Sequence, residues 1–199
     1  MKLYLTVIGI AMAVIAAANL VFGVAVWYYV IIGVIWCTAL QFAFDGIIAI
    51  TVNNLPLSWF KGEGRLFRVS NWEKSLYKKL RVRKLKDKVW ELGGLGGFSK
   101  RKIEDPRSPQ YVERFIVECN KGVVTHRLSY FIGYLAMPTM SGVCIYTIGL
   151  PVAFVNMVLN ILPTIVLRDN TPKLRSLLER MRRAEVKKVK RESDKMVSP

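Results

Sequence analysis

Two long apolar runs are the feature that most restricts how this chain can fold. Residues 3–52 carry one charged side chain, Asp45, and residues 128–167 carry none. A helix needs about 20 apolar residues to cross a bilayer core about 30 Å thick, so each run is long enough for two passes. The sequence therefore predicts an all-α integral membrane protein with four transmembrane helices, and it excludes a soluble globular domain and a disordered chain.

Each run must contain a point at which the chain reverses. In the first run we expect the turn at residues 19–23, where an asparagine and a glycine flank Leu-Val-Phe. In the second run we expect the turn near residues 149–151, where a glycine and a proline interrupt the apolar sequence. Residues 1–18 also fit a cleaved signal peptide, because Met-Lys precedes an apolar stretch that ends in three alanines. That alternative stays open.

Charge is confined almost entirely to the segments between and after these runs. The chain has 30 Lys and Arg residues against 14 Asp and Glu residues. The positive-inside rule places such segments, and with them both termini, on the cytoplasmic side of a bacterial cell membrane. The expected organisation is an N-terminal two-span hairpin (1–52), a basic cytoplasmic segment (53–127), a C-terminal two-span hairpin (128–167) and a basic amphipathic tail (168–199). Because no groove-reading motif accompanies the charge, membrane lipids are expected partners and nucleic acid is not.

An amphipathic helix is predicted within the basic cytoplasmic segment. Ser70 and Glu73 have the spacing of a capping box, in which each side chain hydrogen-bonds the other residue's backbone N–H. Trp72, Leu76 and Leu80 follow at helical spacing, while the other faces are rich in lysine and arginine. We expect this helix to lie on the cytoplasmic surface of the membrane.

Two further helix starts are visible in the charged segments. Ser108 followed by Pro109 is typical of a helix N-terminus, and this helix leads toward the third apolar span. In the tail, Thr171 followed by Pro172 has the same form. The apolar residues after it recur at helical intervals and are Leu174, Leu177, Leu178 and Met181. This pattern predicts a second interfacial amphipathic helix.

His126 is the strongest candidate for catalysis, because histidine titrates near neutral pH and can accept a proton from a hydroxyl. The alternative is a helix-terminal histidine that anchors at the lipid headgroups. Glu118 lies eight residues earlier, which on a continuous helix is a rise of about 12 Å and a rotation of about 80°. The two side chains could then line one cleft but could not hydrogen-bond, unless the helix breaks at Gly122.

An acid that orients His126 must otherwise come from elsewhere, and Asp45, Glu73 and Asp87 are the candidates. Asp45 is notable because an acid inside a membrane span is costly and suggests a function. The alternative is an acid at interface depth. A metal site is not predicted, since a single histidine without a Cys or Asp cluster cannot supply a usual zinc ligand set.

Residues 53–185 resemble the glycosyl-4,4'-diaponeurosporenoate acyltransferase family of small membrane enzymes, whose type member completes the carotenoid staphyloxanthin. Four weak motifs in the right order carry the resemblance. They are Leu55-Pro56-Leu57-Ser58-Trp59-Phe60, the Glu73 helix with Tyr77 that ends in Val82-Arg83-Lys84-Leu85-Lys86-Asp87, the pair Glu118 and His126, and Asn160-Ile-Leu-Pro163 leading into Leu167-Arg168-Asp169-Asn170.

The resemblance implies an enzyme that transfers a fatty acyl group to a sugar hydroxyl of a lipid-linked glycoside. The donor would be an acyl thioester, either acyl-CoA or acyl carrier protein, and no cofactor is implied. His126 would be the general base, with Glu118 or another acid supporting it. The implied substrate-binding residues are Glu73, Tyr77, Arg83, Lys84, Lys86, Asp87, Asn160, Arg168 and Asn170.

Within that set, the cations would bind the donor's phosphates or stabilise the oxyanion, and the two asparagines would position the sugar or cap helices. Two alternatives stay open. One is an acyltransferase that acts on glycerol phosphate or a lysophospholipid, and the other is a non-catalytic membrane scaffold for a lipid-modifying complex.

Overall fold

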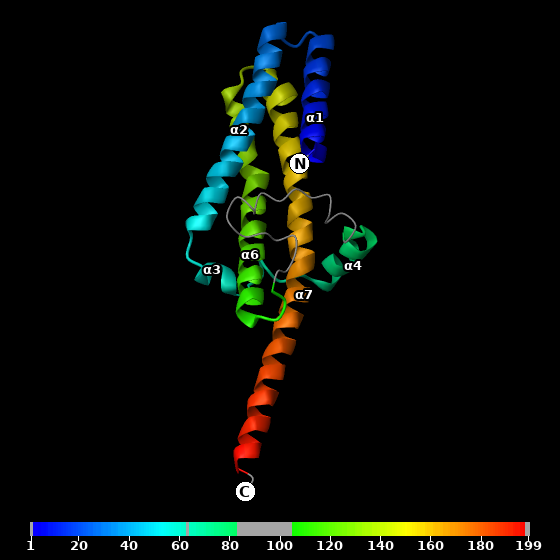
Figure 1. The fold of residues 1–199 in the computed structure, drawn as a ribbon. Helices are drawn as coiled ribbons and strands as arrows, with labels where there is room; N and C mark the ends of the chain where they lie inside the picture. The colour runs from blue at the N-terminus through cyan, green and yellow to red at the C-terminus, as the bar shows by residue number, and fades with distance from the viewer. Residues whose placement is uncertain (1, 63, 83–104, 198–199) are drawn as a thin grey trace.

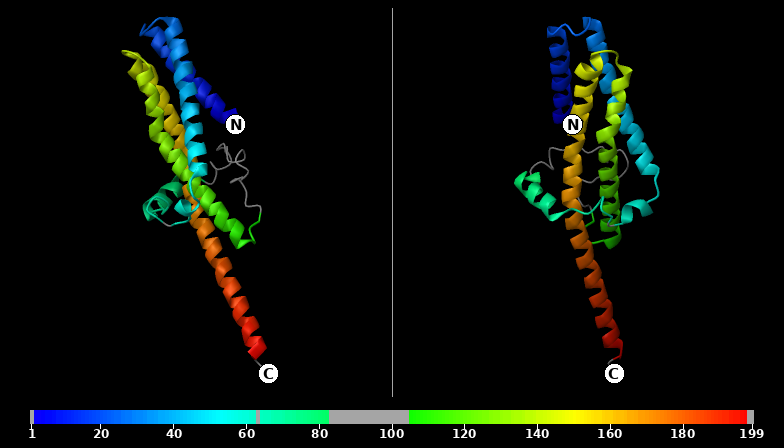
Figure 2. Two further views of the ribbon diagram at one scale, coloured as in Figure 1. Left: turned by 90° about the vertical axis from the view of Figure 1, so that its left-hand side faces the viewer. Right: turned by 180° about the vertical axis from the view of Figure 1, so that it is seen from behind.

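The fold is a bundle of long antiparallel helices, seen in a computed structural model that describes residues 2–62, 64–82 and 105–197. Figures 1 and 2 show the long helices side by side, with the C-terminal part of the last one projecting beyond the bundle. The elements are α1 (Lys2–Val21), α2 (Trp27–Asn54), α3 (Ser58–Lys61), α4 (Asn71–Lys79), α6 (Pro109–Ile132), the 3-10 helix η3 (Gly133–Thr139), the π-helix η4 (Ile145–Gly149) and α7 (Leu150–Val197).

Three helical stretches in the described residues are long and apolar enough to cross a membrane. They are Tyr4–Val21, Trp27–Asn54 and the apolar part of Ile145–Asp194. The described residues are helical, as predicted, and three helices, not clearly four, have the length and apolarity of membrane spans. The third predicted span is divided, because α6 begins in charged sequence at Pro109 and its apolar end passes into η3 at Gly133.

The two hairpin turns lie at the same end of the bundle (Figure 1). The first turn follows Val21, as predicted, and Gly23 adopts a left-handed backbone with φ of +62°. The predicted second turn at residues 149–151 is wrong, because the chain reverses earlier, around Gly142, which has φ of +56°. A glycine without a Cβ adopts this conformation at little cost, so Ser-Gly rather than Gly-Leu-Pro forms the turn.

Gly149 serves packing instead of turning. A Cβ at this position would lie 3.1 Å from the Cα of Met137, so η4 and η3 approach too closely for a side chain. Pro151 causes no break either, because η4 runs directly into α7 through a helical Leu150. Proline cannot donate to the Thr147 carbonyl four residues earlier, and Asn19 Nδ2 donates to that carbonyl instead.

Polar contacts reinforce the apolar packing between the two hairpins. Tyr29 Oη and Ser141 Oγ are 2.9 Å apart, and the buried Asn19 donates from Nδ2 to the Thr147 carbonyl at 2.9 Å. An apolar cluster joins α2, the turn between η3 and η4, η4 and α7; its buried members are Val30, Val34, Cys37, Met140, Cys144, Ile148 and Val152. These contacts fix the depth of α7 relative to α2, which positions the site described below.

The helix α7 is continuous, so the predicted new helix start at Thr171 is wrong. Thr171 Oγ1 donates to the Leu167 carbonyl within the helix, and Pro163 and Pro172 are both internal. A proline at 163 cannot donate to the Leu159 carbonyl. Tyr4 Oη of α1 donates to that carbonyl at 3.4 Å, and so partly replaces the lost hydrogen bond.

The apolar stripe of the tail packs on protein, which corrects its assignment to the membrane surface. Leu174 and Leu178 are buried, with Leu177 and Met181 packed beside them. Their partners come from the first half of α6 and include Val112, Phe115, Ile116 and Cys119. The sequence pattern could not distinguish these two outcomes, since an apolar stripe fits a lipid surface and a partner helix equally well.

The helix α4 confirms the predicted capping box but differs in length and in the face that it buries. Ser70 Oγ accepts from Glu73 N at 3.1 Å, and Glu73 Oε2 accepts from Ser70 N at 2.8 Å. The helix ends at Lys79, and Arg81 has a positive φ of 50°. Tyr77 is buried, whereas Trp72 is exposed, so the membrane-facing role of the Trp72 face stays a prediction.

We expect Gly149→Ala to lower the stability of the bundle by about 1–3 kcal/mol, because the added methyl group meets the η3 backbone. The measurement is the thermal midpoint of the protein in detergent micelles. Gly9→Ala is the matched control, since no atom lies within 4 Å of a Cβ there. Equal midpoints for the two variants would contradict the close approach at Gly149.

Candidate functional site

His126 faces a polar group inside the bundle, where α6 lies against α7. Its Nδ1 is 2.7 Å from Oδ1 of Asn160 on α7. Asn160 is buried, in a part of α7 that carries no charged side chain from residue 150 to residue 167. The interaction therefore joins the predicted general base to one of the predicted substrate-binding residues.

The surroundings of Asn160 determine which way its amide group points. Its Nδ2 donates to Asp45 Oδ2 at 3.3 Å, to the Asn156 carbonyl at 3.1 Å and to Asn156 Oδ1 at 3.2 Å. Because all three are acceptors, the oxygen of the amide must face His126. The proton of a neutral His126 ring is then on Nδ1, which leaves the lone pair on Nε2.

Asp45 of α2 completes this chain of contacts, which we call the Asp45–Asn160–His126 chain. Its Oδ1 accepts from Asn156 Nδ2 at 3.4 Å, and its Oδ2 accepts from Asn160. Asp45 was predicted as a candidate acid for His126, and the structure connects the two through Asn160. A carboxylate in an apolar span is costly unless it is hydrogen-bonded, and two asparagine side chains supply those bonds.

Close contact between α2 and the end of α6 positions these side chains. Gln41 Nε2 donates to the Gly133 carbonyl at 2.7 Å, and Gln41 is buried. A Cβ at Gly133 would overlap Gln41 and would lie 3.2 Å from Asn156 Nδ2. Gly133 therefore allows α2 and α7 to approach the end of α6 closely enough for Asp45 and Asn160 to meet.

Glu118 lies apart from His126. The helix α6 is continuous through Gly122, so the two residues are separated by a rise of about 12 Å, as the spacing predicts. Glu118 instead pairs with Lys121, whose Nζ is 3.8 Å from Oε1 and also donates to the Asn53 carbonyl at 3.4 Å. The break at Gly122 that would bring Glu118 to His126 does not occur.

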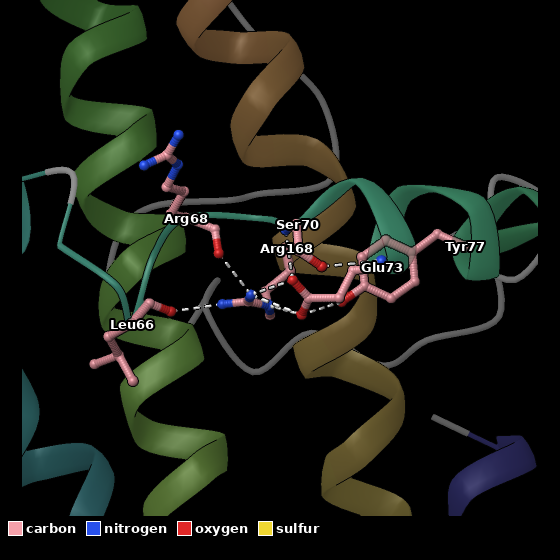
Figure 3. Close-up of polar contacts among 6 residues, drawn as sticks. All are labelled: Leu66, Arg68, Ser70, Glu73, Tyr77 and Arg168. Carbon is pink, nitrogen blue, oxygen red and sulfur yellow. Dashed lines mark hydrogen bonds and ion pairs between the residues drawn. The ribbon is translucent and has the colours of Figure 1, made fainter.

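A second polar cluster gathers three predicted residues, Glu73, Tyr77 and Arg168 (Figure 3). Arg168 of α7 is buried and contacts both carboxylate oxygens of Glu73 from Nη2, at 2.7 and 2.9 Å. Tyr77 Oη donates to Glu73 Oε1 at 3.3 Å. Arg168 also donates to the carbonyls of Leu66 at 2.5 Å and Arg68 at 2.9 Å. It thereby holds the irregular segment before α4 against α7.

Opposing effects set the ionisation of this cluster. Partial burial, the largest single effect, disfavours the charged form of Glu73. The hydrogen bonds from Ser70 and Arg168 and the charge of Arg168 outweigh it together, so the pKa of Glu73 lies below its ordinary value. Burial raises the pKa of Tyr77, which therefore stays protonated and acts as a donor.

The other predicted site residues divide into two groups. Asn170 is half-buried in α7 and caps no helix, because α7 continues past it. Arg83, Lys84, Lys86 and Asp87 lie outside the described residues. Sequence reasoning missed Asn156, although a signal was present. Asn156 and Asn160 are the polar residues four apart in an apolar run, which places them on one helix face.

Comparison with known families identifies the family of the chain. The model of the glycosyl-4,4'-diaponeurosporenoate acyltransferase family matches residues 56–180. The chain belongs to this family. The matched range contains His126, Asn160, Glu73 and Arg168, while Asp45 lies before it. Neither a curated protein nor a solved structure matches the chain.

We expect Arg168→Leu to destabilise the protein by about 2–4 kcal/mol. Removing one partner of a fully buried ion pair costs about 3–5 kcal/mol, and we reduce that range because the Glu73 side chain is 20% exposed. Lys173→Gln is the control, because it breaks the more exposed pair with Asp169 and should cost less than about 1 kcal/mol. Thermal midpoints in detergent measure both, and a smaller effect for Arg168→Leu would contradict the role given to this pair.

The ionisation of Glu73 predicts a loss of stability in acid. Its pKa is lower in the folded protein, so its stabilising contribution is complete above the ordinary value of about 4.3 and is lost as the pH falls through the lowered folded value. The difference in thermal midpoint between the wild type and Glu73→Gln should therefore shrink on acidification from pH 7 to pH 3. A difference that stays constant over this range would refute the prediction.

Proposed function

We propose that this protein transfers a fatty acyl group from an acyl thioester to a hydroxyl of a lipid-linked sugar. Membership of an acyltransferase family supports acyl transfer in general. The contact between His126 and Asn160 carries the proposal, because it gives a neutral histidine the tautomer that a general base needs. The apolar helices favour a reaction at the membrane, and the basic segments favour its cytoplasmic face.

The proposed reaction begins when His126 Nε2 accepts the proton of the acceptor hydroxyl. The hydroxyl oxygen attacks the thioester carbonyl carbon, and the carbonyl π electrons move to its oxygen. The tetrahedral intermediate then collapses, the carbon–sulfur bond breaks, and the imidazolium returns the proton to the leaving thiolate. An ester and a free thiol are the products, so the histidine ends in its starting state.

Asp45, rather than Glu118, is the acid that we assign to the support of His126. The imidazolium formed during the reaction has both ring nitrogens protonated, and Asn160 Oδ1 already accepts from Nδ1. The negative charge of Asp45 lies on the other side of the Asn160 amide and favours the positive ring. Glu118 has Lys121 as a partner and lies too far along α6 for direct contact.

The Glu73–Arg168 pair has a positioning role in this proposal. Arg168 makes hydrogen bonds to Glu73 and to two backbone carbonyls, so its charge is already matched inside the protein. We therefore assign contacts with the donor's phosphates or the oxyanion to other cations, and Arg83, Lys84 and Lys86 stay candidates. Glu73 and Tyr77 hold α4 in place, and α4 precedes these three cations in the sequence.

We expect His126→Ala to lower acyl transfer by at least about a hundredfold, the usual minimum contribution of a general base. The assay uses purified protein in native-lipid nanodiscs with labelled palmitoyl-CoA and a total lipid extract. The mass of the labelled product identifies the acceptor and separates a sugar lipid from a glycerol phosphate or lysophospholipid. If CoA gives no product, acyl carrier protein replaces it as the donor. Turnover by His126→Ala near the wild-type rate would refute the assignment.

Two further variants distinguish the possible supporting acids. Asn160→Ala removes the acceptor on Nδ1 and the connection to Asp45, so it should lower kcat by at least about tenfold. Glu118→Gln should leave kcat within about threefold, because Glu118 pairs with Lys121. The reverse order of effects would assign the role to Glu118. Thermal midpoints of both variants control for unfolding.

A further inference from the structure

A small basic pocket lies beside the Glu73–Arg168 pair. It has a volume of about 170 Å³ and is lined by Phe67, Arg68, Val69, Lys74, Thr171, Pro172 and Arg175. Three of these residues are cationic and none is acidic. The volume is well below the 300–1,000 Å³ or so of a site for a whole drug-sized ligand, so the pocket fits one small anionic group.

Two acids that lie close to the pocket residues in the sequence, Glu73 and Asp169, already have cationic partners. Glu73 is hydrogen-bonded to Arg168, and Asp169 pairs with Lys173. The side chains of Arg68 and Lys74 have no hydrogen-bond or ion-pair partner among the described residues, and Figure 3 shows Arg68 pointing away from the Glu73–Arg168 contact. Like charges around one hollow repel each other, and a bound anion would offset that repulsion.

The Glu73–Arg168 pair builds this pocket. Arg168 holds the carbonyls of Leu66 and Arg68. Phe67 packs among residues of α2, α3 and α6, and Val69 packs in a cluster with Val166 of α7. Both of these side chains are buried and form the apolar part of the lining. Arg175 of α7 donates to the Gly62 carbonyl at 3.0 Å, which fixes its position. The walls are therefore held by contacts that do not depend on a ligand.

The pocket and the proposed catalytic chain lie on the same face of α7. Eleven residues separate Asn160 from Thr171, a rise of about 16 Å and a net rotation of about 20° on a continuous helix. An acyl thioester of the phosphopantetheine type has about 13 bonds between phosphorus and sulfur, the length of four to five extended residues, or about 15 Å. A phosphate in the pocket would thus place the thioester at the depth of Asn160 and His126.

We propose that this pocket binds the phosphate of the donor's phosphopantetheine arm, which acyl-CoA and acyl carrier protein share. The inference rests on the proposed function, because it assumes a thioester donor. Arg68, Lys74 and Arg175 supply the positive charge, and the Thr171 side chain lines the pocket from α7. The arm extends from the pocket along α7, and the acyl chain continues toward the apolar helices.

The test is equilibrium binding by calorimetry to the full chain in phosphatidylcholine nanodiscs. The probes are 4'-phosphopantetheine, pantetheine and inorganic phosphate. We expect 4'-phosphopantetheine to bind at least about tenfold more tightly than either of the others. The double variant Arg68→Gln with Lys74→Gln should weaken its binding at least about tenfold. The control is Lys78→Gln with Lys79→Gln, which removes the same charge from exposed positions of α4 outside the pocket and should bind as the wild type does.

Three outcomes would overturn the proposal. Pantetheine or inorganic phosphate that binds as tightly as 4'-phosphopantetheine would exclude recognition of the phosphorylated arm. Equal binding by the two double variants would place the site elsewhere. A lipid headgroup site would be identified if the Arg68 and Lys74 double variant loses only its binding of phosphatidylglycerol, added to the nanodiscs as a labelled lipid.

Binding by His126→Ala separates this proposal from the proposed function. That variant should bind 4'-phosphopantetheine as the wild type does while it fails to transfer the acyl group. If it retains turnover, the catalytic assignment fails and the pocket result still stands. If the wild type binds pantetheine as tightly as 4'-phosphopantetheine while His126→Ala is inactive in acyl transfer, the pocket assignment fails and the catalytic assignment stands.

Discussion

The continuity of α7 is the constraint on which the rest of this structure depends. One unbroken helix carries Asn160 inside the bundle, Arg168 at the Glu73 contact and Thr171 at the basic pocket. A rigid helix fixes the spacing of these residues at about 1.5 Å per position and fixes their relative directions. A break at either internal proline would leave the three contacts free to move independently.

Tertiary packing is what keeps the helix continuous. Prolines inside a helix remove a hydrogen bond and cost about 3 kcal/mol, so an isolated peptide of this sequence would bend or break. In the bundle, Tyr4 donates to the carbonyl that Pro163 leaves without its usual partner. Beyond Pro172, Leu174 and Leu178 are buried against α6. Burial of two leucine side chains contributes about 3–6 kcal/mol, which is comparable with the cost of the proline.

The sequence predicted the features that depend on local chemistry or on the solvent. The long apolar runs gave the helical membrane class, and Ser70 with Glu73 gave a capping box. The predictions failed where two tertiary outcomes share one local pattern. Gly149 with Pro151 has the residues of a turn but serves close packing, and Thr171 with Pro172 has the form of a helix start but lies inside α7. The same limit applies to the site, because the sequence left Glu118, Asp45, Glu73 and Asp87 as candidate acids for His126. Only the packing of α2 against α7 shows that Asp45 connects to His126 through Asn160.

The polar groups near His126 explain why an acid can persist in so apolar a setting. Burying the Asp45 carboxylate without hydrogen bonds would cost free energy, and so would burying the Asn156 and Asn160 side-chain N–H groups without an acceptor. Together, the two asparagines donate to the Asp45 carboxylate, and the amide oxygen of Asn160 contacts His126. This arrangement fixes the histidine tautomer before any substrate binds. Electrostatic support that is already oriented requires no reorganisation during the reaction, so the same contacts that make Asp45 tolerable also prepare His126 to accept a proton.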